Sequence, residues 1–363
     1  MRIGIIGAGQ LGRMLALAGY PLGSRFHFLD RSAEAPGAQV GEIVLGAFDD
    51  PQRLAELAQQ VELITFDVEN VPADLLNEIA AQRPFLPPVN ALATAQDRLA
   101  EKQLFDSLGI ATPQWHAVDS LAELETGIGA IGLPAVLKTR RLGYDGRGQM
   151  VLREPADIQT AWEKLGSWPL ILEQFMPFER EVSIIGARST GGETVYYPLS
   201  ENTHQDGILH YCTAPYIDQA MQATAESYLA QLFEKFDYAG VLTIEFFVVD
   251  GQLVANEIAP RVHNSGHWTI EGARTSQFEN HIRAIRGLPL GSTTPIGHSA
   301  MVNFIGQLPP LETVLAIRGA KYHDYGKSPR PLRKLGHCTI TTSDAGDRDS
   351  SLQRLLQLVH AGS

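Results

Sequence analysis

The sequence predicts an α/β protein, with α+β organisation in its central part, divided into two or three domains. Segments with the apolar pattern of strands alternate with helical segments along the first half of the chain, which is typical of sheets covered by helices. A length of 363 residues exceeds what one ordinary hydrophobic core organises. The hydrophobic share of 44% and the charged share of 19% are those of a soluble globular protein.

Charge and cysteine content argue against several classes of partner. The net charge is -12 and the isoelectric point is near 5.4, whereas a nucleic-acid backbone calls for a basic face. Any phosphate is therefore bound locally, by a few placed groups. Cys212 and Cys338 form neither a disulfide framework nor a metal-ligand set, which fits a reducing cytoplasm. Met1–Ile6 is too short for a signal peptide, and no run approaches the roughly 18 apolar residues of a membrane span.

The first element is a strand, Arg2–Ile6, that leads into the glycine loop Gly7–Gly12 and a helix over Arg13–Ala18. A second strand, Arg25–Leu29, ends at Asp30, about twenty residues after the glycine loop. This spacing matches the dinucleotide fingerprint, in which glycines make a tight turn, a helix N-terminus binds an anion and the acid binds a ribose. Taken alone, this fingerprint would indicate a nicotinamide dehydrogenase, or a loop that binds some other phosphate.

The third parallel strand, Val61–Phe66, is followed at once by polar groups at Asp67, Glu69 and Asn70. Carboxylates at this end of a strand lie where open α/β sheets bind ligands. Asp67 or Asn70 could instead cap the following helix, Ala73–Ala80. We therefore expect Glu69 to be the functional residue of this group.

Three prolines, Pro84, Pro87 and Pro88, mark the end of the first region because they cannot continue regular structure. The pattern from Ala91 to Leu108 then predicts one helix. Its basic residues, Arg98 and Lys102, would ordinarily form a solvated face.

A lysine strand and a glycine-rich loop follow. The strand Ala135–Lys138 ends at Lys138, and three glycines and three arginines come directly after it: Gly143, Gly146, Gly148, Arg140, Arg141 and Arg147. Glycines let backbone N–H groups approach an anion, and arginines supply charge, so the stretch predicts a mobile loop that covers phosphate. A cationic surface turn is the alternative.

The next segments predict a strand over Gln149–Arg153, a helix over Ala156–Leu165 and a strand over Leu170–Glu173. Glu173 to Met176 closes the last strand, and Pro177 follows. This break suggests a hinge between two lobes, where free backbone groups could bind a flat ring.

A hairpin signal spans Val241 to Ala259, with Asp250-Gly251 at its turn. With a three-residue loop, Glu245 lies directly opposite Glu257. Facing carboxylates repel each other unless something neutralises them, and a divalent cation that also binds phosphate oxygens would do so. A two-residue turn would instead place Asn256 opposite Glu245, and two exposed acids on a solvated face remain the alternative.

Two later segments are rich in groups that bind oxygen anions. Pro260–Trp268 contains Arg261, two histidines, Asn264 and Ser265, a composition that favours a binding site over a core. A linker, 287–295, leads to a small last region with the basic segment 327–334. Its side chains would complete an anion pocket, unless they simply face solvent.

These motifs together resemble the ATP-grasp superfamily and, within it, the N5-carboxyaminoimidazole ribonucleotide synthetase family. The resemblance covers essentially the whole chain, and its motifs are Gly7–Leu15, Gly143–Gln149, Asn202–Leu209, Asn256–Thr269 and Arg333–His337. It implies a Rossmann-like region 1–95, an ATP-grasp region 96–288 with a lid at about 112–173, and a C-terminal region 289–363. At Asp67 the sequence departs from the family, which more often has Glu there.

The resemblance implies an ATP- and bicarbonate-dependent carboxylation of 5-aminoimidazole ribonucleotide through carboxyphosphate, in purine biosynthesis, by a cytoplasmic homodimer that uses Mg²⁺. The formate-dependent glycinamide ribonucleotide transformylase is the nearest alternative, although its loop is expected to lack Tyr-Asp-Gly-Arg. A dehydrogenase and a non-catalytic nucleotide sensor are more distant alternatives. Small molecules are the expected partners, with neither nucleic acid nor membrane.

The resemblance also assigns residues. ATP would be bound by Arg98, Lys138, Gly143, Tyr144, Asp145, Gly146, Arg147, Gly148, Gln149, Glu173, Gln174, Phe175, Met176, Glu181, His204, Asn256 and Glu257. Mg²⁺ would be bound by Glu245 and Glu257. The ribonucleotide would be bound by Gln10, Leu11, Glu69, Asn264, Lys327, Arg333 and Lys334. Catalytic groups around the aminoimidazole and carboxyphosphate would be Tyr144, Asp145, Arg147, Arg261, His263 and Asn264, with Asp145 as the proton acceptor or as a residue that shapes the loop.

Overall fold

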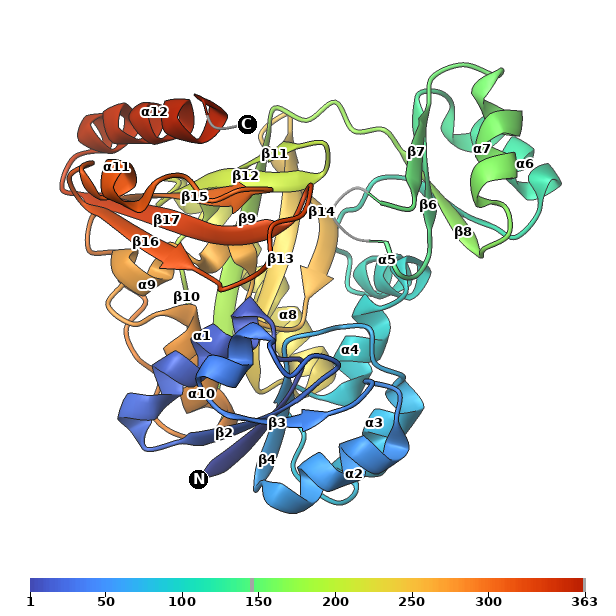
Figure 1. Cartoon of the computed structure of the whole chain (residues 1–363). Helices are drawn as coiled ribbons and strands as arrows, with labels where there is room; N and C mark the ends of the chain where they lie inside the picture. The colour runs from blue at the N-terminus through green and yellow to red at the C-terminus, as the bar shows by residue number, and fades with distance from the viewer. Residues whose placement is uncertain (144–146, 362–363) are drawn as a thin grey trace.

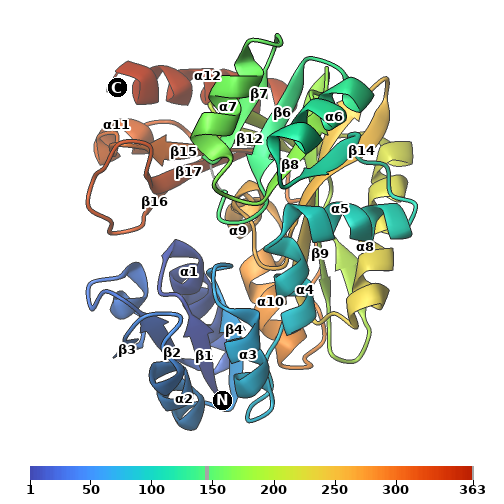
Figure 2. The same cartoon turned by 90° about the vertical axis from the view of Figure 1, so that its right-hand side faces the viewer.

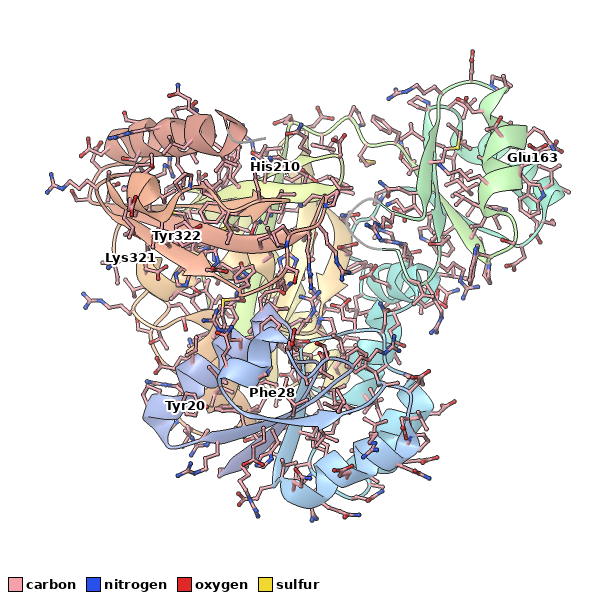
Figure 3. All side chains as sticks on the ribbon, in the orientation of Figure 1. Tyr20, Phe28, Glu163, His210, Lys321 and Tyr322 are labelled. Atoms are coloured by element: carbon pink, nitrogen blue, oxygen red, sulfur yellow. The ribbon has the colours of Figure 1, made fainter. Side chains whose placement is uncertain are left out.

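The computed structural model describes residues 1–143 and 147–361, and it arranges their strands in three sheets (Figure 1). The first is parallel, in the order β3-β2-β1-β4. Its elements are β1 (Arg2–Ile6), α1 (Gln10–Gly19), β2 (Arg25–Asp30), β3 (Glu42–Leu45), α2 (Pro51–Gln60), β4 (Leu63–Phe66) and α3 (Ala73–Ala80). Phe28 of β2, labelled in Figure 3, is fully buried in the core of this region. The expected strand–loop–helix unit is formed by β1, the glycines that follow it and α1.

The single helix expected from Ala91 to Leu108 is two helices, α4 (Val89–Ala95) and α5 (Arg98–Ser107). Asp97 separates them because its backbone is extended, with φ at -128°, and its side chain accepts a hydrogen bond from the Leu99 N–H. An aspartate in this role starts a new helix by satisfying a free N–H group of the first turn.

The second sheet is antiparallel, in the order β5-β8-β6-β7, and stands apart from the central sheet in Figure 1. In Figure 2 it faces the viewer, in front of the central sheet. Helices α6 and α7 cover it. Its elements are β5 (Trp115–Val118), α6 (Leu121–Ile131), β6 (Ala135–Thr139), β7 (Gln149–Leu152), α7 (Asp157–Leu165) and β8 (Leu170–Gln174). Lys138 pairs with Gln149, so the glycine-rich loop joins two neighbouring strands.

The third sheet has the order β14-β13-β9-β11-β12-β15-β17-β16, with β10 paired to β9. Its earlier elements are β9 (Arg180–Arg188), β10 (Thr194–Tyr196), β11 (Ser200–Gln205), β12 (Ile208–Ala214), α8 (Gln219–Phe236), β13 (Gly240–Val249), β14 (Gln252–Ala259), η3 (Asn264–Gly266), α9 (Thr269–Gly272) and α10 (Gln277–Ile285). The last elements are β15 (His298–Ile305), α11 (Leu311–Leu315), β16 (Ala320–Asp324), β17 (Lys334–Thr342) and α12 (Ala345–Ala361). Because β15 pairs with β12, the strands of the C-terminal region extend the central sheet.

The second sheet and its helices bury an apolar cluster of their own, whereas the first and central regions share a larger cluster that includes Phe28 and Phe278. Helix α1 packs against α10, which joins the first region to the central one. Among the residues that the structure describes, no helix is long and apolar enough to cross a membrane.

Candidate active site

A cavity of about 780 Å³ lies where the three regions meet. Most of the residues that the sequence pointed to line it: Gln10, Leu11, Glu69, Arg98, Lys138, Gly143, Arg147, Gln149, Glu173, Gln174, Phe175, Met176, Glu181, His204, Glu245, Asn256, Glu257, Arg261, His263, Asn264, Lys327, Arg333 and Lys334. Gly148 is not among the lining residues, and Tyr144, Asp145 and Gly146 lie outside the described residues. Segments far apart in the sequence therefore converge on one site.

Lys138 and the hinge are joined by a buried ion pair. Lys138 Nζ donates to Glu173 Oε2 at 3.0 Å, and Lys102 Nζ lies 3.6 Å from the same oxygen. Burial alone would raise the pKa of Glu173, but the charges of Lys102 and Lys138 lower it to about 2. The ionised carboxylate thus holds Lys138 at the wall of the cavity.

Lys102 does not belong to a solvated basic face, because its side chain is fully buried. Its Nζ donates to the backbone oxygen of Asn256 at 2.7 Å. The adjacent Glu101 accepts from the Ile258 N–H at 2.6 Å, and burial raises the pKa of Glu101 to about 8. Helix α5 therefore binds the outer edge of β14, a contact that the sequence did not indicate.

The hairpin brings Glu245 opposite Glu257, although by a different route from the one expected. Its loop has two residues, Asp250 and Gly251, and both have positive φ, as a tight hairpin turn requires. Val249 therefore pairs with Gln252, and not with Leu253 as a three-residue loop would require. A bulge between Glu245 and Phe246 then shifts the register by one residue. The facing carboxylates are confirmed, and the turn is the two-residue alternative; the expectation that such a turn places Asn256 opposite Glu245 is wrong, because the bulge shifts the register.

The two carboxylates have different electrostatic environments. Glu257 Oε2 accepts from Arg98 Nη1 at 3.0 Å; burial alone would raise the pKa of Glu257, but Arg98 lowers it. Burial, reinforced by the charge of Glu257, raises the pKa of Glu245 to about 7 despite the nearby His204. The positive charges of His204 and Lys334 therefore do not offset the burial of Glu245.

The oxygen atoms here suit a hard cation. Besides the two carboxylates, Asn256 Oδ1 is buried and accepts no hydrogen bond. Within residues 1–143 and 147–361 no group of three or more His, Cys, Asp and Glu could hold a metal. Mg²⁺ is commonly bound by one or two carboxylates, with waters and substrate phosphates as its other ligands, so this oxygen set fits it.

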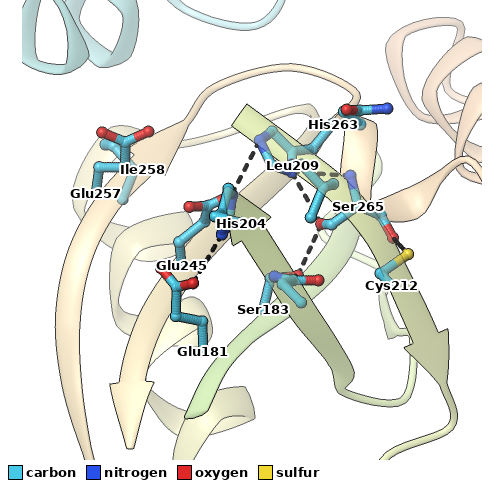
Figure 4. A network of polar contacts seen from close by, with 12 residues as sticks. Glu181, Ser183, His204, Leu209, Cys212, Glu245, Glu257, Ile258, His263 and Ser265 are labelled. Carbon is cyan, nitrogen blue, oxygen red and sulfur yellow. Dashed lines mark hydrogen bonds and ion pairs between the residues drawn. The ribbon is translucent and has the colours of Figure 1, made fainter. Parts of the chain in front are cut away.

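Two histidines face the acids of the central sheet (Figure 4). His204 Nδ1 lies 2.9 Å from Glu181 Oε2, and His263 Nε2 lies 3.2 Å from Glu245 Oε1. Burial, reinforced by the nearby charge of Arg261, lowers the pKa of His263 well below its ordinary value, so its imidazole is neutral at pH 7.

Between the central region and the first region, Arg261 Nε lies 2.9 Å from Glu69 Oε1. Gln96 Nε2 donates to the backbone oxygens of Glu69 and Val71, which fixes the loop that carries Glu69. Lys327 Nζ donates to Gln10 Oε1, so the basic segment reaches the first region. Lys327, Arg333 and Lys334 of this segment line the cavity. Arg330, to which the sequence assigned no role, lines the cavity as well.

The first glycine loop binds the protein's own carboxylates. Asp67 Oδ2 accepts from the Gly12 N–H at 2.9 Å, and a Cβ on Gly7 would lie 1.9 Å from Asp67 Oδ1. Asp30 Oδ2 accepts from the Ala8 N–H at 2.9 Å. The expectation that Asp67 or Asn70 caps the next helix is therefore wrong, because Pro72 precedes α3 without a side-chain cap. The acid of the fingerprint, Asp30, is likewise engaged within the loop.

Two of the arginines near the second loop are also engaged locally. Arg140 makes two hydrogen bonds to Asp97, at 2.7 and 2.9 Å, and Arg141 makes one at 3.4 Å. Asp97 could have been recognised as a helix cap from its position before Arg98. Lys102 gave no comparable signal, because its burial depends on how α5 packs against β14.

Comparisons with known proteins identify all three regions. Family models match a ribonucleotide synthetase preATP-grasp domain at residues 1–96, an ATP-grasp domain at 103–278 and a phosphoribosylaminoimidazole carboxylase C-terminal domain at 299–351. The N5-carboxyaminoimidazole ribonucleotide synthase of Pseudomonas aeruginosa is 51% identical over 361 residues, covering 99% of this chain and 100% of its own length.

Solved structures with a similar fold belong to the same family as these sequence relatives. The N5-carboxyaminoimidazole ribonucleotide synthetase from Thermus thermophilus is 51% identical, with a TM-score of 0.94 over 98% of both chains. The Aspergillus clavatus synthase, solved with ADP and 5-aminoimidazole ribonucleotide, is 30% identical, with a TM-score of 0.93 over 99% of this chain and 98% of its own. The chain therefore belongs to the N5-carboxyaminoimidazole ribonucleotide synthase family of ATP-grasp enzymes.

Proposed function

We propose that this protein uses ATP and bicarbonate to carboxylate 5-aminoimidazole ribonucleotide to N5-carboxyaminoimidazole ribonucleotide. One observation carries the proposal: a single cavity is lined by the Lys138–Glu173 hinge, the facing pair Glu245 and Glu257, and the basic segment that begins at Lys327. The hinge suits a nucleotide, and the pair of glutamates suits a cation that also binds phosphate. The basic segment suits the phosphate of a second substrate.

In this proposal, ATP lies between the antiparallel lid and the central sheet. The hinge from Glu173 to Met176 binds adenine, and Glu181 with His204 binds the ribose. Arg98, Lys138, Arg147 and Gln149 surround the phosphates. Glu245 and Glu257 would hold Mg²⁺, whose charge would offset theirs and that of the phosphates.

The chemistry requires charge neutralisation and positioning more than a nucleophilic side chain. A bicarbonate oxygen attacks the γ-phosphorus of ATP, the bond to the β-phosphate oxygen breaks and ADP leaves. The resulting carboxyphosphate releases CO₂ and phosphate, and the exocyclic amine of the ribonucleotide then attacks the CO₂ and loses a proton. Cationic groups that face the developing charge are the expected catalytic devices. Arg261 and Asn264 line this part of the cavity.

The ribonucleotide would lie across the opening between the first region and the basic segment. The Lys327–Gln10 contact, with Arg333 and Lys334 at the same wall, supports a phosphate site there. Glu69 would bind the sugar or the base. Asp145 remains the proposed proton acceptor on sequence grounds alone.

The test is ADP release from Mg·ATP in parallel mixtures. We expect release with aminoimidazole ribonucleotide plus bicarbonate, and none with glycinamide ribonucleotide plus formate. Turnover in the formate mixture alone would overturn the assignment. The resemblance to the family also implies a cytoplasmic homodimer, and light scattering on the purified protein would test the dimer.

A further inference from the structure

Three buried serines form a hydrogen-bonded chain near Glu245, and two of them, Ser183 and Ser265, are labelled in Figure 4. Ser183 Oγ on β9 lies 2.9 Å from Ser200 Oγ on β11 and 2.7 Å from Ser265 Oγ in η3. Ser265 Oγ lies 2.9 Å from His263 Nδ1. None of the three serines is more than 1% exposed. This series of hydroxyl groups therefore ends at Nδ1 of His263, and the other ring nitrogen, Nε2, faces Glu245.

The direction of the hydrogen bonds in this chain follows from one contact. The backbone N–H of Ser265 points at His263 Nδ1, at 3.3 Å, so Nδ1 is an acceptor and carries no proton. The ring proton is therefore on Nε2. The Ser265 hydroxyl then donates to Nδ1 and the Ser183 hydroxyl donates to Ser265. The single proton of the Ser200 hydroxyl is shared between Ser183 Oγ at 2.9 Å and Asn202 Oδ1 at 3.4 Å. Asn202 Nδ2 donates to Ser183 Oγ at 3.1 Å, which is consistent with this order.

The backbone of His263 is held as firmly as its ring. Its N–H donates to Gln277 Oε1 at 2.9 Å, and Gln277 Nε2 donates to its carbonyl oxygen at 2.6 Å. Gln277 is fully buried. On the sheet, Ser183 is the direct neighbour of Glu245 on one side and of Ser200 on the other. The ring and the carboxylate are thus built into one rigid unit.

We propose that the chain Ser200–Ser183–Ser265 makes His263 a positioning residue that holds its Nε2 against Glu245 Oε1, at 3.2 Å, and so orients this carboxylate toward the cation. This inference rests on the proposed function only in taking Glu245 as a cation ligand. It changes the role expected for His263, from a group that meets the aminoimidazole to one that orients a metal ligand. Histidine and carboxylate partners of this kind commonly tune metal affinity in other sites.

The first test reads the tautomer in the full-length protein. With ¹⁵N-labelled histidine, the His263 ring should show a protonated Nε2 and an unprotonated Nδ1 at pH 7.5, and His263→Gln identifies its signals. A protonated Nδ1 in the wild-type protein would overturn the proposal.

The second test measures binding of Mn²⁺ in the presence of ADP, followed by the loss of free-ion signal in electron paramagnetic resonance. His263→Phe should raise the Mn²⁺ Kd about 10-fold or more, and Ser265→Ala about 3-fold to 10-fold. The matched control is Ser299→Ala, which removes a buried hydroxyl bonded to Thr341 outside the site and should leave the Kd unchanged.

Wild-type Mn²⁺ affinity in both folded variants would overturn the proposal. Neither test needs bicarbonate or the ribonucleotide. Absence of carboxylation alongside the expected tautomer and Mn²⁺ results would therefore contradict the proposed function alone.

Discussion

The two glycine-rich loops look alike in the sequence but differ in the structure. In the loop Gly7–Gly12, the Asp67 carboxylate lies against the glycines and accepts from the Gly12 N–H. In the second loop, the described residues Gly143 and Arg147 line the cavity, beside Lys138 of β6. The glycines of the first loop therefore meet a carboxylate of the protein itself, whereas Gly143 and Arg147 of the second loop line the cavity.

This comparison predicts that the second loop contributes mainly to activity. Lys138→Met should lower ADP release about 10³-fold, equivalent to about 4 kcal/mol, because a cation facing the phosphates is lost. Lys164→Met, at an exposed position of α7 in the same region, is the control and should retain full activity. If the Lys138 variant released ADP at the wild-type rate, the inference that the second loop contributes mainly to activity would be contradicted.

The first loop should contribute mainly to stability. Gly7→Ala should cost about 3 kcal/mol in the free energy of unfolding, because φ is +95° and the new Cβ would meet Asp67 at 1.9 Å. Gly143→Ala, where the nearest atom is 3.2 Å away and φ is not left-handed, should cost less than about 1 kcal/mol. Urea denaturation measures both values, and equal losses would contradict the comparison.

Asp67 should make stability depend on pH. Burial raises its folded-state pKa to about 6 from 3.8, so the folded protein binds the proton more tightly than the unfolded chain does. Its contribution to stability should therefore fall by about 2–3 kcal/mol as the pH rises from about 4 to about 6. Asp67→Asn keeps an acceptor for the Gly12 N–H and should remove this component of the pH profile of urea midpoints. An unchanged profile would show that Asp67 is ionised throughout.

The basic segment 327–334, which contacts the first loop through Lys327 and Gln10, gives the smallest expected effect. Lys334→Ala should raise the KM for the ribonucleotide about 10-fold, because one cation of a phosphate site is lost, and should leave the KM for ATP unchanged. Steady-state kinetics with each substrate varied in turn separates the two values. A selective loss of ATP affinity would place this side chain at the wrong phosphate.

Much of the fold could be predicted from the sequence because its signals are local. The parallel strands around the first glycine loop, the lysine strand and the hairpin all follow from apolar patterns and turn residues within a few positions. The break at Asp97 was also local, and it was missed because the apolar pattern continues through it.

The remaining features depend on contacts between distant segments. The bulge that sets Glu245 opposite Glu257 occurs where Glu101 and Lys102 bond to the backbone of β14. Nothing in the hairpin sequence encodes that helix contact. Similarly, the sequence allowed Asp67 to cap the helix that follows it. Only the fold shows that its carboxylate instead accepts a hydrogen bond from the N–H of Gly12, which lies 55 residues earlier in the chain.

The central claim is that bicarbonate is activated by ATP in this cavity, and oxygen transfer tests it most directly. With ¹⁸O-labelled bicarbonate, Mg·ATP and aminoimidazole ribonucleotide, mass spectrometry of the released phosphate should find one ¹⁸O per turnover, because the attacking oxygen stays on phosphorus when carboxyphosphate releases CO₂. Phosphate without ¹⁸O, formed at the same rate as ADP, would contradict the carboxyphosphate route.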